Sequence, residues 1–430
     1  MISTSQKKVI FFSKDLVKKK NYAHSIFSYF AIFEKNPGSF LIKAIIKKKN
    51  YFFLIISSLR HMYGIINTKL TAINCLDLDC SYKNIIVSWA FKNNFKKNGI
   101  FFDKYLKKSS AESNNIIWLL IYMDKKLPDK IGKNILLVQH KKNFLKGIYF
   151  FFKYFFECFS NNLFNGNFFG RFNSFFSFSS ELTKIYKRNI NLEKIKNFLV
   201  VYEGQIFQKE LIKFNRNNFK DIKNIAYDHS APPPLPLNLI YDKFSPDFLY
   251  VTGGAQGKFY RKNLLWPKNK IKITKPLRFK GEKKSNYSNK LFLPYELYDE
   301  KIYLKNLIFL LNKEKLNIKD YHIKLHPLRF EKKSHLTFLN QIKNINNKNY
   351  KKKSFINSVF FGQTTAVIIA LEFGITCYHV CTESEFDSYS KNFWPDINIQ
   401  QLNKNVFKYR LKKRGSFLNF SSKQDFSKLC

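Results

Sequence analysis

The chain has 430 residues, of which 45% are hydrophobic and 18% aromatic, enough apolar side chain for packed cores and unlike a disordered polymer. Lysine and arginine number 75 against 30 acidic residues, a formal net charge of +45. This charge favours an anionic membrane surface over nucleic acid as a partner, because no nucleic-acid-binding motif occurs. The lysines are spread along a chain rich in Lys, Asn, Ile and Phe, so translation of AT-rich DNA is the favoured explanation for most of the excess, and a membrane-surface role for part of it.

Six cysteines occur without a C-x-x-C pair or a zinc-ligand spacing, so we predict no metal site and a reduced, cytoplasmic protein. No signal peptide and no uncharged apolar run of about 18 residues is found. The nearest approach, residues 144–159, is interrupted by Lys146, Lys153 and Glu157. It predicts a buried helix, and a helix lying peripherally on the inner membrane is the alternative.

The length of the whole chain suggests two domains. In residues 1–280 continuous apolar runs alternate with helical patterns, which predicts an α/β domain. Its insertion, residues about 140–195, is Phe-rich and helical in pattern. A proline-rich stretch, residues 231–236, predicts a stiff extended loop. Its strands are expected at residues 8–13, 84–91, 116–122, 134–139, 198–202, 222–227, 247–251 and 271–274, with a helix at 206–214.

A charged run at residues 280–290 resembles a linker, so the second domain is expected at residues 281–430. The basic tail after residue 404 predicts a helix packed back on the domain or a frayed end. Helices are expected at residues 299–315, 332–345 and 364–373, and strands at 321–323, 355–361 and 375–380.

Two loops of the second domain carry candidate chemistry. His326 follows a predicted buried strand, at the carboxyl end where open α/β sheets bind ligands, and Pro327 holds it extended. Gln363, Thr364 and Thr365 precede a helix, and hydroxyls with free amides at a helix start bind anions. Together they indicate a phosphate-bearing ligand. A surface histidine and ordinary capping threonines are the alternative.

Five ordered segments carry a resemblance to a known family. They are Glu203-Gly204-Gln205, Tyr227-Asp228-His229-Ser230, Pro246-Asp247 with Val251-Thr252-Gly253, Pro276-Leu277-Arg278-Phe279, and Lys324 to Pro327 with Gln363-Thr364-Thr365. Over residues 198–380 the chain resembles bacterial surface carbohydrate biosynthesis proteins, which are GT-B glycosyltransferases with two Rossmann-like domains facing a cleft. The last segment is also similar to motifs of sialyl- and Kdo-type transferases, which use CMP-linked sugars.

The resemblance implies a role for each of these residues. Glu203 would be the catalytic base, although Tyr202 replaces a first acidic residue of the motif, and His326 would act on the donor phosphate. The substrates would contact Gly204, Gln205, His229 and Arg278, of which His229 would orient the acceptor and Arg278 would add charge to the donor site. The donor would be held by Lys324, His326, Pro327, Gln363, Thr364, Thr365 and Glu372, the last of them on the ribose. A helix-capping Glu203, a structural His229 and a merely exposed Glu372 stay open.

The implied function is transfer of a sugar from a nucleotide-activated, CMP-linked donor to a growing surface polysaccharide or lipid-linked glycan. No cofactor, no metal and no nucleic acid is expected. A polyol-phosphate transferase of the CDP-glycerol type is the alternative reaction. A non-catalytic binding protein of the same fold is the alternative from another class of function.

Overall fold

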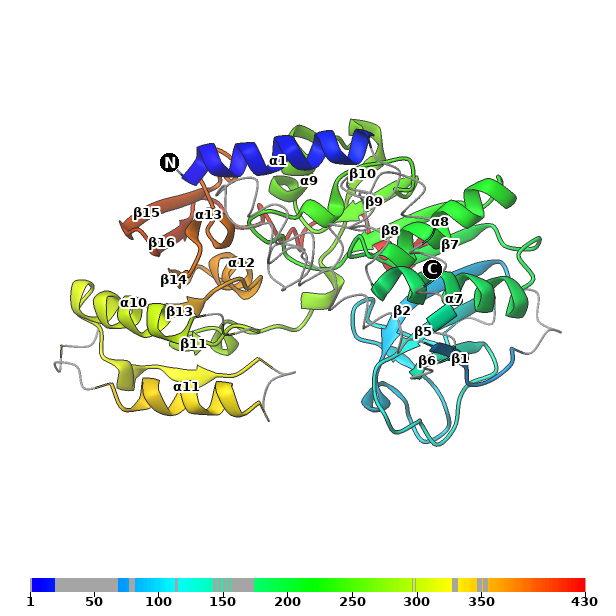
Figure 1. Cartoon of the computed structure of the whole chain (residues 1–430), viewed down its shortest axis with the longest axis horizontal. Helices are drawn as coiled ribbons and strands as arrows, with labels where there is room; N and C mark the ends of the chain where they lie inside the picture. The colour runs from blue at the N-terminus through cyan, green and yellow to red at the C-terminus, as the bar shows by residue number, and fades with distance from the viewer. Residues whose placement is uncertain are drawn as a thin grey trace.

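Two β-sheets flanked by helices organise the computed structural model (Figure 1). The structure describes residues 2–19, 69–76, 82–112, 115–141, 174–295, 297, 299–326, 332–345, 350 and 355–429, with isolated positions at 145, 148, 149, 152 and 156. The first sheet lies between residues 69 and 273, and the second between residues 290 and 411. The α/β class expected from the alternating apolar pattern is therefore confirmed.

The first sheet has the strand order β1-β6-β5-β2-β7-β8-β9-β10. All neighbours pair in parallel except β1 and β6. The chain builds outward from β2 to β6, then returns to the other side of β2 with β7, which makes the β2–β7 boundary a topological switch point. The strands are β1 Lys69–Ala72, β2 Asn84–Ala90, β5 Ile116–Tyr122, β6 Ile135–Lys141, β7 Asn197–Val201, β8 Lys223–Asp228, β9 Phe248–Val251 and β10 Ile271–Ile273.

Helices cover this sheet, and a short hairpin follows β2. The helices are α7 Ser174–Asn189, α8 Ile206–Asn218 and α9 Gly254–Asn263, and the hairpin strands are β3 Phe102–Asp103 and β4 Lys108–Ser109. All seven residues of β5 are buried, as expected of a strand covered on both faces. Each large apolar side chain buried in this way contributes roughly 1.5–3 kcal/mol, so these continuous runs dominate the stability of the sheet.

The second sheet has the order β12-β11-β13-β14-β16-β15, in which β11 to β14 are parallel and the last two strands antiparallel. Its switch point lies between β11 and β13. The strands are β11 Lys290–Phe292, β12 His322–Lys324, β13 Asn357–Phe361, β14 Thr376–Val380, β15 Ile397–Asn403 and β16 Val406–Leu411, and the helices are α10 Glu300–Lys313, α11 Lys333–Lys343, α12 Ala366–Glu372 and α13 Ser384–Asp387.

Each end of the chain packs on the opposite half. Helix α1, Ile2–Lys19, lies along α13, where Gln6 Nε2 donates to the Ser388 carbonyl at 2.8 Å. In return, Phe426 near the C-terminus stacks on Tyr227 of β8, with ring centroids 5.1 Å apart. One hydrophobic cluster includes residues of both sheets. The two halves are therefore joined by core packing as well as by the linker.

Three expectations from the sequence are wrong. Residues 8–13 belong to α1 rather than to a strand, because Gln6, Val9, Ile10 and Ser13 form one buried helical face. The start of the basic tail forms strand β16 rather than a helix or a frayed end, although the last residues, Phe426–Leu429, do pack back as a short 3-10 helix. The strand before His326 is an edge strand with an exposed His322, not a buried strand.

Much of the predicted insertion, residues 140–195, lies outside the described residues, as does most of the segment 144–159. Its described end is helical, and Tyr186 of α7 is buried against α8 through a 2.9 Å hydrogen bond to Asn215. Among the helices that the structure describes, none is both long and apolar enough to cross a membrane.

Candidate functional site

The loop after β7 places Glu203 at the switch point of the first sheet. Gly204 follows with a φ of +66°, and a Cβ at this position would lie 2.2 Å from the Asn238 carbonyl oxygen. Glycine is the residue that tolerates both constraints. The side chain of Gln208 accepts hydrogen bonds from the Glu203 and Gln205 amides at 2.9 and 3.1 Å and donates to the Val201 carbonyl at 2.7 Å. Glu203 is thus presented by a fixed loop.

Glu203 and His229 form a hydrogen-bonded pair across the ends of β7 and β8. His229 Nε2 lies 3.3 Å from Glu203 Oε1, and Gln205 Nε2 donates to Glu203 Oε2 at 3.2 Å. The side chain of His229 is 1% exposed, whereas that of Glu203 is 23% exposed. The carboxylate is therefore the member of the pair that an external molecule can reach.

The environment favours an ionised Glu203 and a neutral His229. Burial alone raises the pKa of the Glu203 carboxyl, but its interactions with His229, the hydrogen bond from Gln205 and the charge of Arg278 act in the opposite direction, and the net pKa is lowered. Burial lowers the pKa of His229, and the nearby Arg278 lowers it further against the opposing effect of Glu203. Neutral His229 then donates its Nε2 proton to Glu203, which leaves Nδ1 as a buried acceptor without a partner among the described residues.

Tyr105 and Arg278 complete this cluster. The Tyr105 ring meets the His229 ring edge-on at 4.5 Å, and the Arg278 guanidinium lies 5.3 Å from the Tyr105 ring centroid. Burial is the main cause that raises the pKa of Tyr105 to about 12, so its hydroxyl stays protonated at neutral pH. The sequence did not predict Tyr105, because the β3–β4 hairpin that carries it has no extended apolar pattern.

A buried aspartate holds the Tyr105 turn in place. Asp103 Oδ1 accepts hydrogen bonds from the amides of Tyr105 at 2.7 Å and Leu106 at 2.8 Å. Asp103 is fully buried, and burial raises its pKa to about 6. The short turn is thereby fixed to the sheet, and with it the ring that covers His229.

Asp228 belongs to a second buried network beside the cluster. Its Oδ2 accepts from Gln256 Nε2 at 2.6 Å and from the Tyr260 hydroxyl at 2.7 Å. Burial raises its pKa to about 7. Thr252 donates to Gln256 at 3.1 Å and interacts at 3.0 Å with the Phe417 carbonyl, so the network reaches the C-terminal segment.

The second set of predicted residues lies along the carboxyl edge of the second sheet. Gly362 follows β13 with a φ of +54°, and its carbonyl accepts a hydrogen bond from the buried His379. Gln363 Nε2 donates to the Phe386 carbonyl at 3.3 Å. The Thr364 hydroxyl accepts from the Ala366 amide at 3.2 Å, whereas Thr365 makes no side-chain cap on α12. The loop is ordered by its own contacts.

His326 and Lys324 lie one strand away from that loop. His326 packs edge-on against Tyr295 at 5.0 Å, and Lys324 Nζ donates to the Asn286 carbonyl at 3.1 Å. Because β11 separates β12 from β13, the strand ends leading to His326 and Thr364 are about 10 Å apart. They share an edge without direct contact between the strands. Pro327 lies outside the described residues.

Glu372 lies at the far end of α12, away from the loop of Gln363 to Thr365. Its two carboxylate oxygens accept hydrogen bonds from the amides of Gly415 and Phe417, both at 2.6 Å, and of Leu418 at 3.1 Å. Burial raises the pKa of this carboxyl against the effect of those amides. In the structure Glu372 anchors the segment that leads from β16 back to the first sheet.

The segments that follow β8 and β14 connect the carboxyl edges of the two sheets. The Tyr389 hydroxyl donates to the Pro232 carbonyl at 2.9 Å, and Trp394 Nε1 donates to the Pro234 carbonyl at 3.0 Å. The predicted proline-rich loop is therefore the part of the first half on which the second half rests. This loop begins two residues after His229 in the first half. In the second half, the Phe386 carbonyl accepts a hydrogen bond from Gln363, and Phe386 lies three residues before Tyr389.

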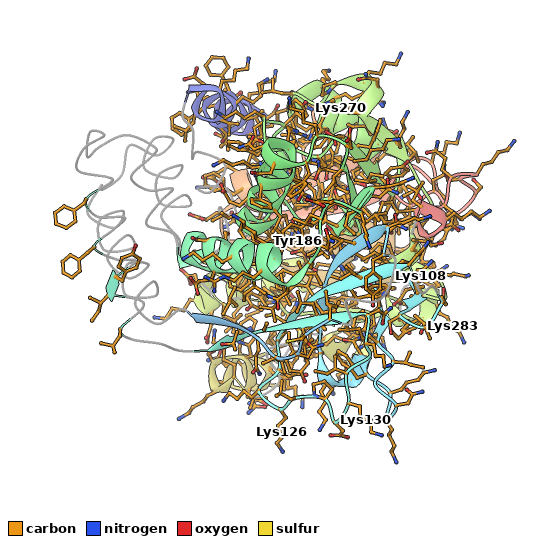
Figure 2. The ribbon with its side chains drawn as sticks, turned by 90° about the vertical axis from the view of Figure 1, so that its right-hand side faces the viewer. Lys108, Lys126, Lys130, Tyr186, Lys270 and Lys283 are labelled. Atoms are coloured by element: carbon orange, nitrogen blue, oxygen red, sulfur yellow. The ribbon has the colours of Figure 1, made fainter. Side chains whose placement is uncertain are left out.

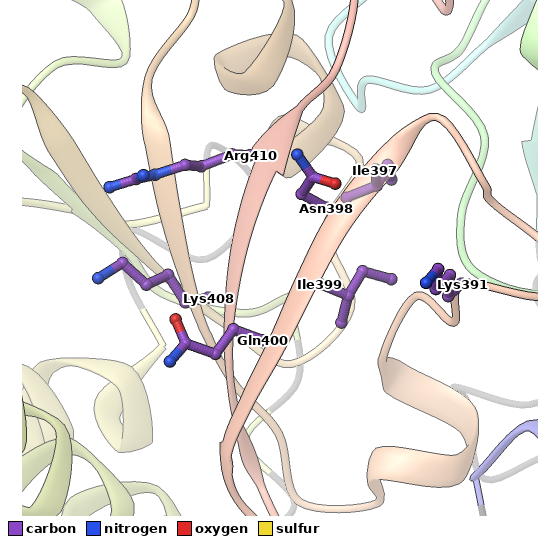
Figure 3. A pocket seen from close by; sticks show the side chains of 7 residues that line it. All are labelled: Lys391, Ile397, Asn398, Ile399, Gln400, Lys408 and Arg410. Carbon is purple, nitrogen blue, oxygen red and sulfur yellow. The ribbon is translucent and has the colours of Figure 1, made fainter.

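A separate cavity of about 310 Å³ lies at the outer hairpin of the second sheet (Figure 3). Gln400, Lys408 and Arg410 are directed to one side of the hairpin, and Ile399 and Lys391 to the other. Lys408 is paired with Glu314 at 2.7 Å, so much of its charge is already neutralised. None of the predicted site residues lines this cavity. The cavity and the Glu203 cluster are therefore separate parts of the molecule.

The positive charge is dispersed over the surface. Lys108, Lys126, Lys130, Lys270 and Lys283 project from separate parts of the face in Figure 2, while Tyr186 lies inside. Within the described part of the chain, no three His, Cys, Asp or Glu side chains are grouped to hold a metal ion.

No protein-family model matches the chain, and no curated protein is similar to it in sequence.

Proposed function

We propose that the protein is a glycosyltransferase of the GT-B type that moves a sugar from a CMP-linked donor to a growing surface polysaccharide or a lipid-linked glycan. The carboxyl edge of the first sheet would bind the acceptor, and that of the second sheet the nucleotide. Two doubly wound sheets joined through their carboxyl-edge segments support this arrangement.

The observation that carries the proposal is the Glu203–His229 pair. A general base needs an ionised, reachable oxygen and a partner that fixes its orientation. Glu203 has both, because its pKa is lowered and His229 and Gln205 each hold one of its oxygens. A merely solvated, helix-capping glutamate would need neither a buried histidine beside it nor a glycine packed tightly against the Asn238 carbonyl.

In the proposed reaction Glu203 accepts the proton of the acceptor hydroxyl. The acceptor oxygen forms a bond to the anomeric carbon of the donor sugar, and the bond from that carbon to the CMP phosphate oxygen breaks. The electron pair leaves with the phosphate, and Glu203 later releases its proton to solvent. His326, Lys324 and the hydroxyls of Thr364 and Thr365 would stabilise the charge on the departing phosphate.

Nucleotide binding tests the proposal directly. We expect CMP to raise the melting temperature of the full chain more than UMP or GMP, because a ligand stabilises the native state in proportion to its affinity. Release of CMP from CMP-N-acetylneuraminate or CMP-Kdo, followed by mass spectrometry, would then test transfer. Turnover of CDP-glycerol alone would replace the sugar transferase with a polyol-phosphate transferase. Binding of CMP without turnover of any donor would indicate a binding protein.

A further inference from the structure

Arg278 is a cation displayed beside the Glu203–His229 pair without an anionic partner. It lies in the 3-10 turn Leu277–Phe279, whose outer residues are buried while Arg278 is exposed. Its guanidinium lies 5.3 Å from the Tyr105 ring and 5.7 Å from the Phe279 ring. Among the described residues, no carboxylate lies within 4.0 Å of its nitrogens.

The aromatic contacts fix the guanidinium without using its donors. A cation over a ring is held by the charge distribution of the ring, whereas its five N–H groups point outward in the plane of the guanidinium. Asp103 in turn fixes Tyr105, and the buried Leu277 and Phe279 fix the turn that carries Arg278. These contacts place the Arg278 guanidinium beside the Tyr105 ring, which itself contacts His229.

Charge balance indicates what that position favours. An ionised Glu203 repels a negatively charged acceptor, and a neutral acceptor needs no cation beside it. A planar fork is suited to a carboxylate, which it binds with two parallel hydrogen bonds. The Tyr105 ring contacts both the Arg278 guanidinium and the His229 ring, and His229 bonds to Glu203, so an anion bound to Arg278 would lie on the side of the cluster that carries the base.

On the basis of the proposed transfer reaction, we propose that the acceptor is an acidic sugar whose carboxylate binds Arg278 above the ring of Tyr105, which brings a hydroxyl of the same sugar to Glu203. Arg278 is then the residue that makes the enzyme specific for an acidic acceptor. A phosphate group would use the same fork, and the test below separates the two.

The test compares matched ligands by saturation-transfer NMR with the full chain. The probes are the methyl glycosides of glucuronic, galacturonic and N-acetylneuraminic acid, each against its own uncharged methyl ester. For the wild type we expect at least one acid to bind roughly tenfold more tightly than its ester, the effect of one charge-assisted contact. Arg278→Gln and Arg278→Lys should both reduce that preference to less than about threefold, because Lys keeps the charge but lacks the fork.

Lys283→Gln is the control, since it removes the same charge from an exposed neighbouring position that has no ring contact in the described structure. An equal loss of preference in Lys283→Gln, or no preference in the wild type for any acid, would overturn the assignment. Tighter binding of methyl glucoside 6-phosphate than of every acid would also overturn it, in favour of a phosphate.

The CMP-induced shift in melting temperature is measured on the same samples. A CMP response without a preference for acids removes only the role of Arg278. A preference for acids without a CMP response removes the transferase and leaves an acid-binding site.

Discussion

The carboxyl edges of the two sheets are organised differently. At the first edge, contacts link Gln205, Glu203, His229, Tyr105 and Arg278 in one series, in which Gln205 and His229 each hold one oxygen of the Glu203 carboxylate. At the second edge, the predicted residues are separated by β11 and mostly bonded to their own backbone surroundings. The first edge is therefore preorganised without a ligand. The predicted residues of the second edge would act together only when a bound ligand contacts all of them.

The largest expected effect is at Glu203. Glu203→Gln should lower the transfer rate roughly 10²–10⁴-fold, the usual contribution of a general base, with little change in CMP binding. The measurement is kcat with saturating donor, alongside the CMP-induced shift in melting temperature. Glu193→Gln, at an exposed position, serves as the control and should retain full activity. Unchanged kinetics in Glu203→Gln would exclude it as the base.

The rigidity of the first edge predicts a large loss of stability at Gly204. Gly204→Ala should cost about 3–5 kcal/mol of unfolding free energy, the sum of a clash with Asn238 and an unfavourable positive φ. Gly281→Ala, at a φ of +88° with no atom within 4 Å of the added Cβ, isolates the φ effect. It should cost about 1 kcal/mol. Equal losses in urea denaturation would show that the loop after Glu203 relaxes freely.

On the second edge, His326→Ala should lower the transfer rate roughly 10²–10³-fold, as removal of one group that stabilises a departing charge does. The melting temperature should stay the same, because His326 follows an edge strand. His322→Ala, at an exposed position of the same strand, is the matched control. Wild-type turnover in His326→Ala would remove the histidine from the reaction.

The contacts of Glu372 predict a structural effect rather than a loss of binding. Glu372→Gln should cost about 1–3 kcal/mol of unfolding free energy, because an amide group cannot accept the hydrogen bonds of all three backbone donors. CMP affinity should be unchanged. Reduced CMP affinity at unaltered stability would instead support the contact with ribose that the resemblance implies.

The last prediction concerns pH dependence at Asp228. The pKa of its carboxyl is about 7 in the folded chain and near 3.8 when unfolded, so between these values the folded state binds a proton that the unfolded state releases. This group therefore makes the unfolding free energy fall as pH rises from 4 to about 7. Asp228→Asn should remove that fall in urea titrations between pH 5 and 8. A pH-independent difference between the two proteins would contradict the assignment.

Sequence patterns predicted the central strands well, because runs such as Ile116 to Tyr122 are apolar at every position and cannot be placed outside a covered sheet. They failed for α1, where the buried face contains the polar Gln6 and Ser13 and the short run from Val9 to Phe12 is compatible with a strand. They also failed for β16, because Lys408 pairs with Glu314 at the end of α10 and packs over the Tyr378 ring, contacts that a basic run in the sequence does not reveal.

The candidate site was predictable where motif residues adjoin strands. Glu203 and His229 both follow apolar runs, and parallel strands bring such positions to one edge. Tyr105 was not predictable, because its place beside His229 depends on a short hairpin whose turn is held by hydrogen bonds from backbone amides to the buried Asp103. The hydrogen bonds of Glu372 could not be predicted either, because the backbone amides that donate to it lie more than 40 residues later in the chain.

The exchange of chain ends between the halves has a practical consequence for producing fragments. A polypeptide cut near residue 280 would leave the first half without Phe426, which stacks on Tyr227, and the second half without α1 beside α13. Each piece expressed alone would present a bare apolar surface and tend to aggregate. Co-expression of the two pieces should instead allow them to reassemble, with each terminus restoring the surface of its counterpart.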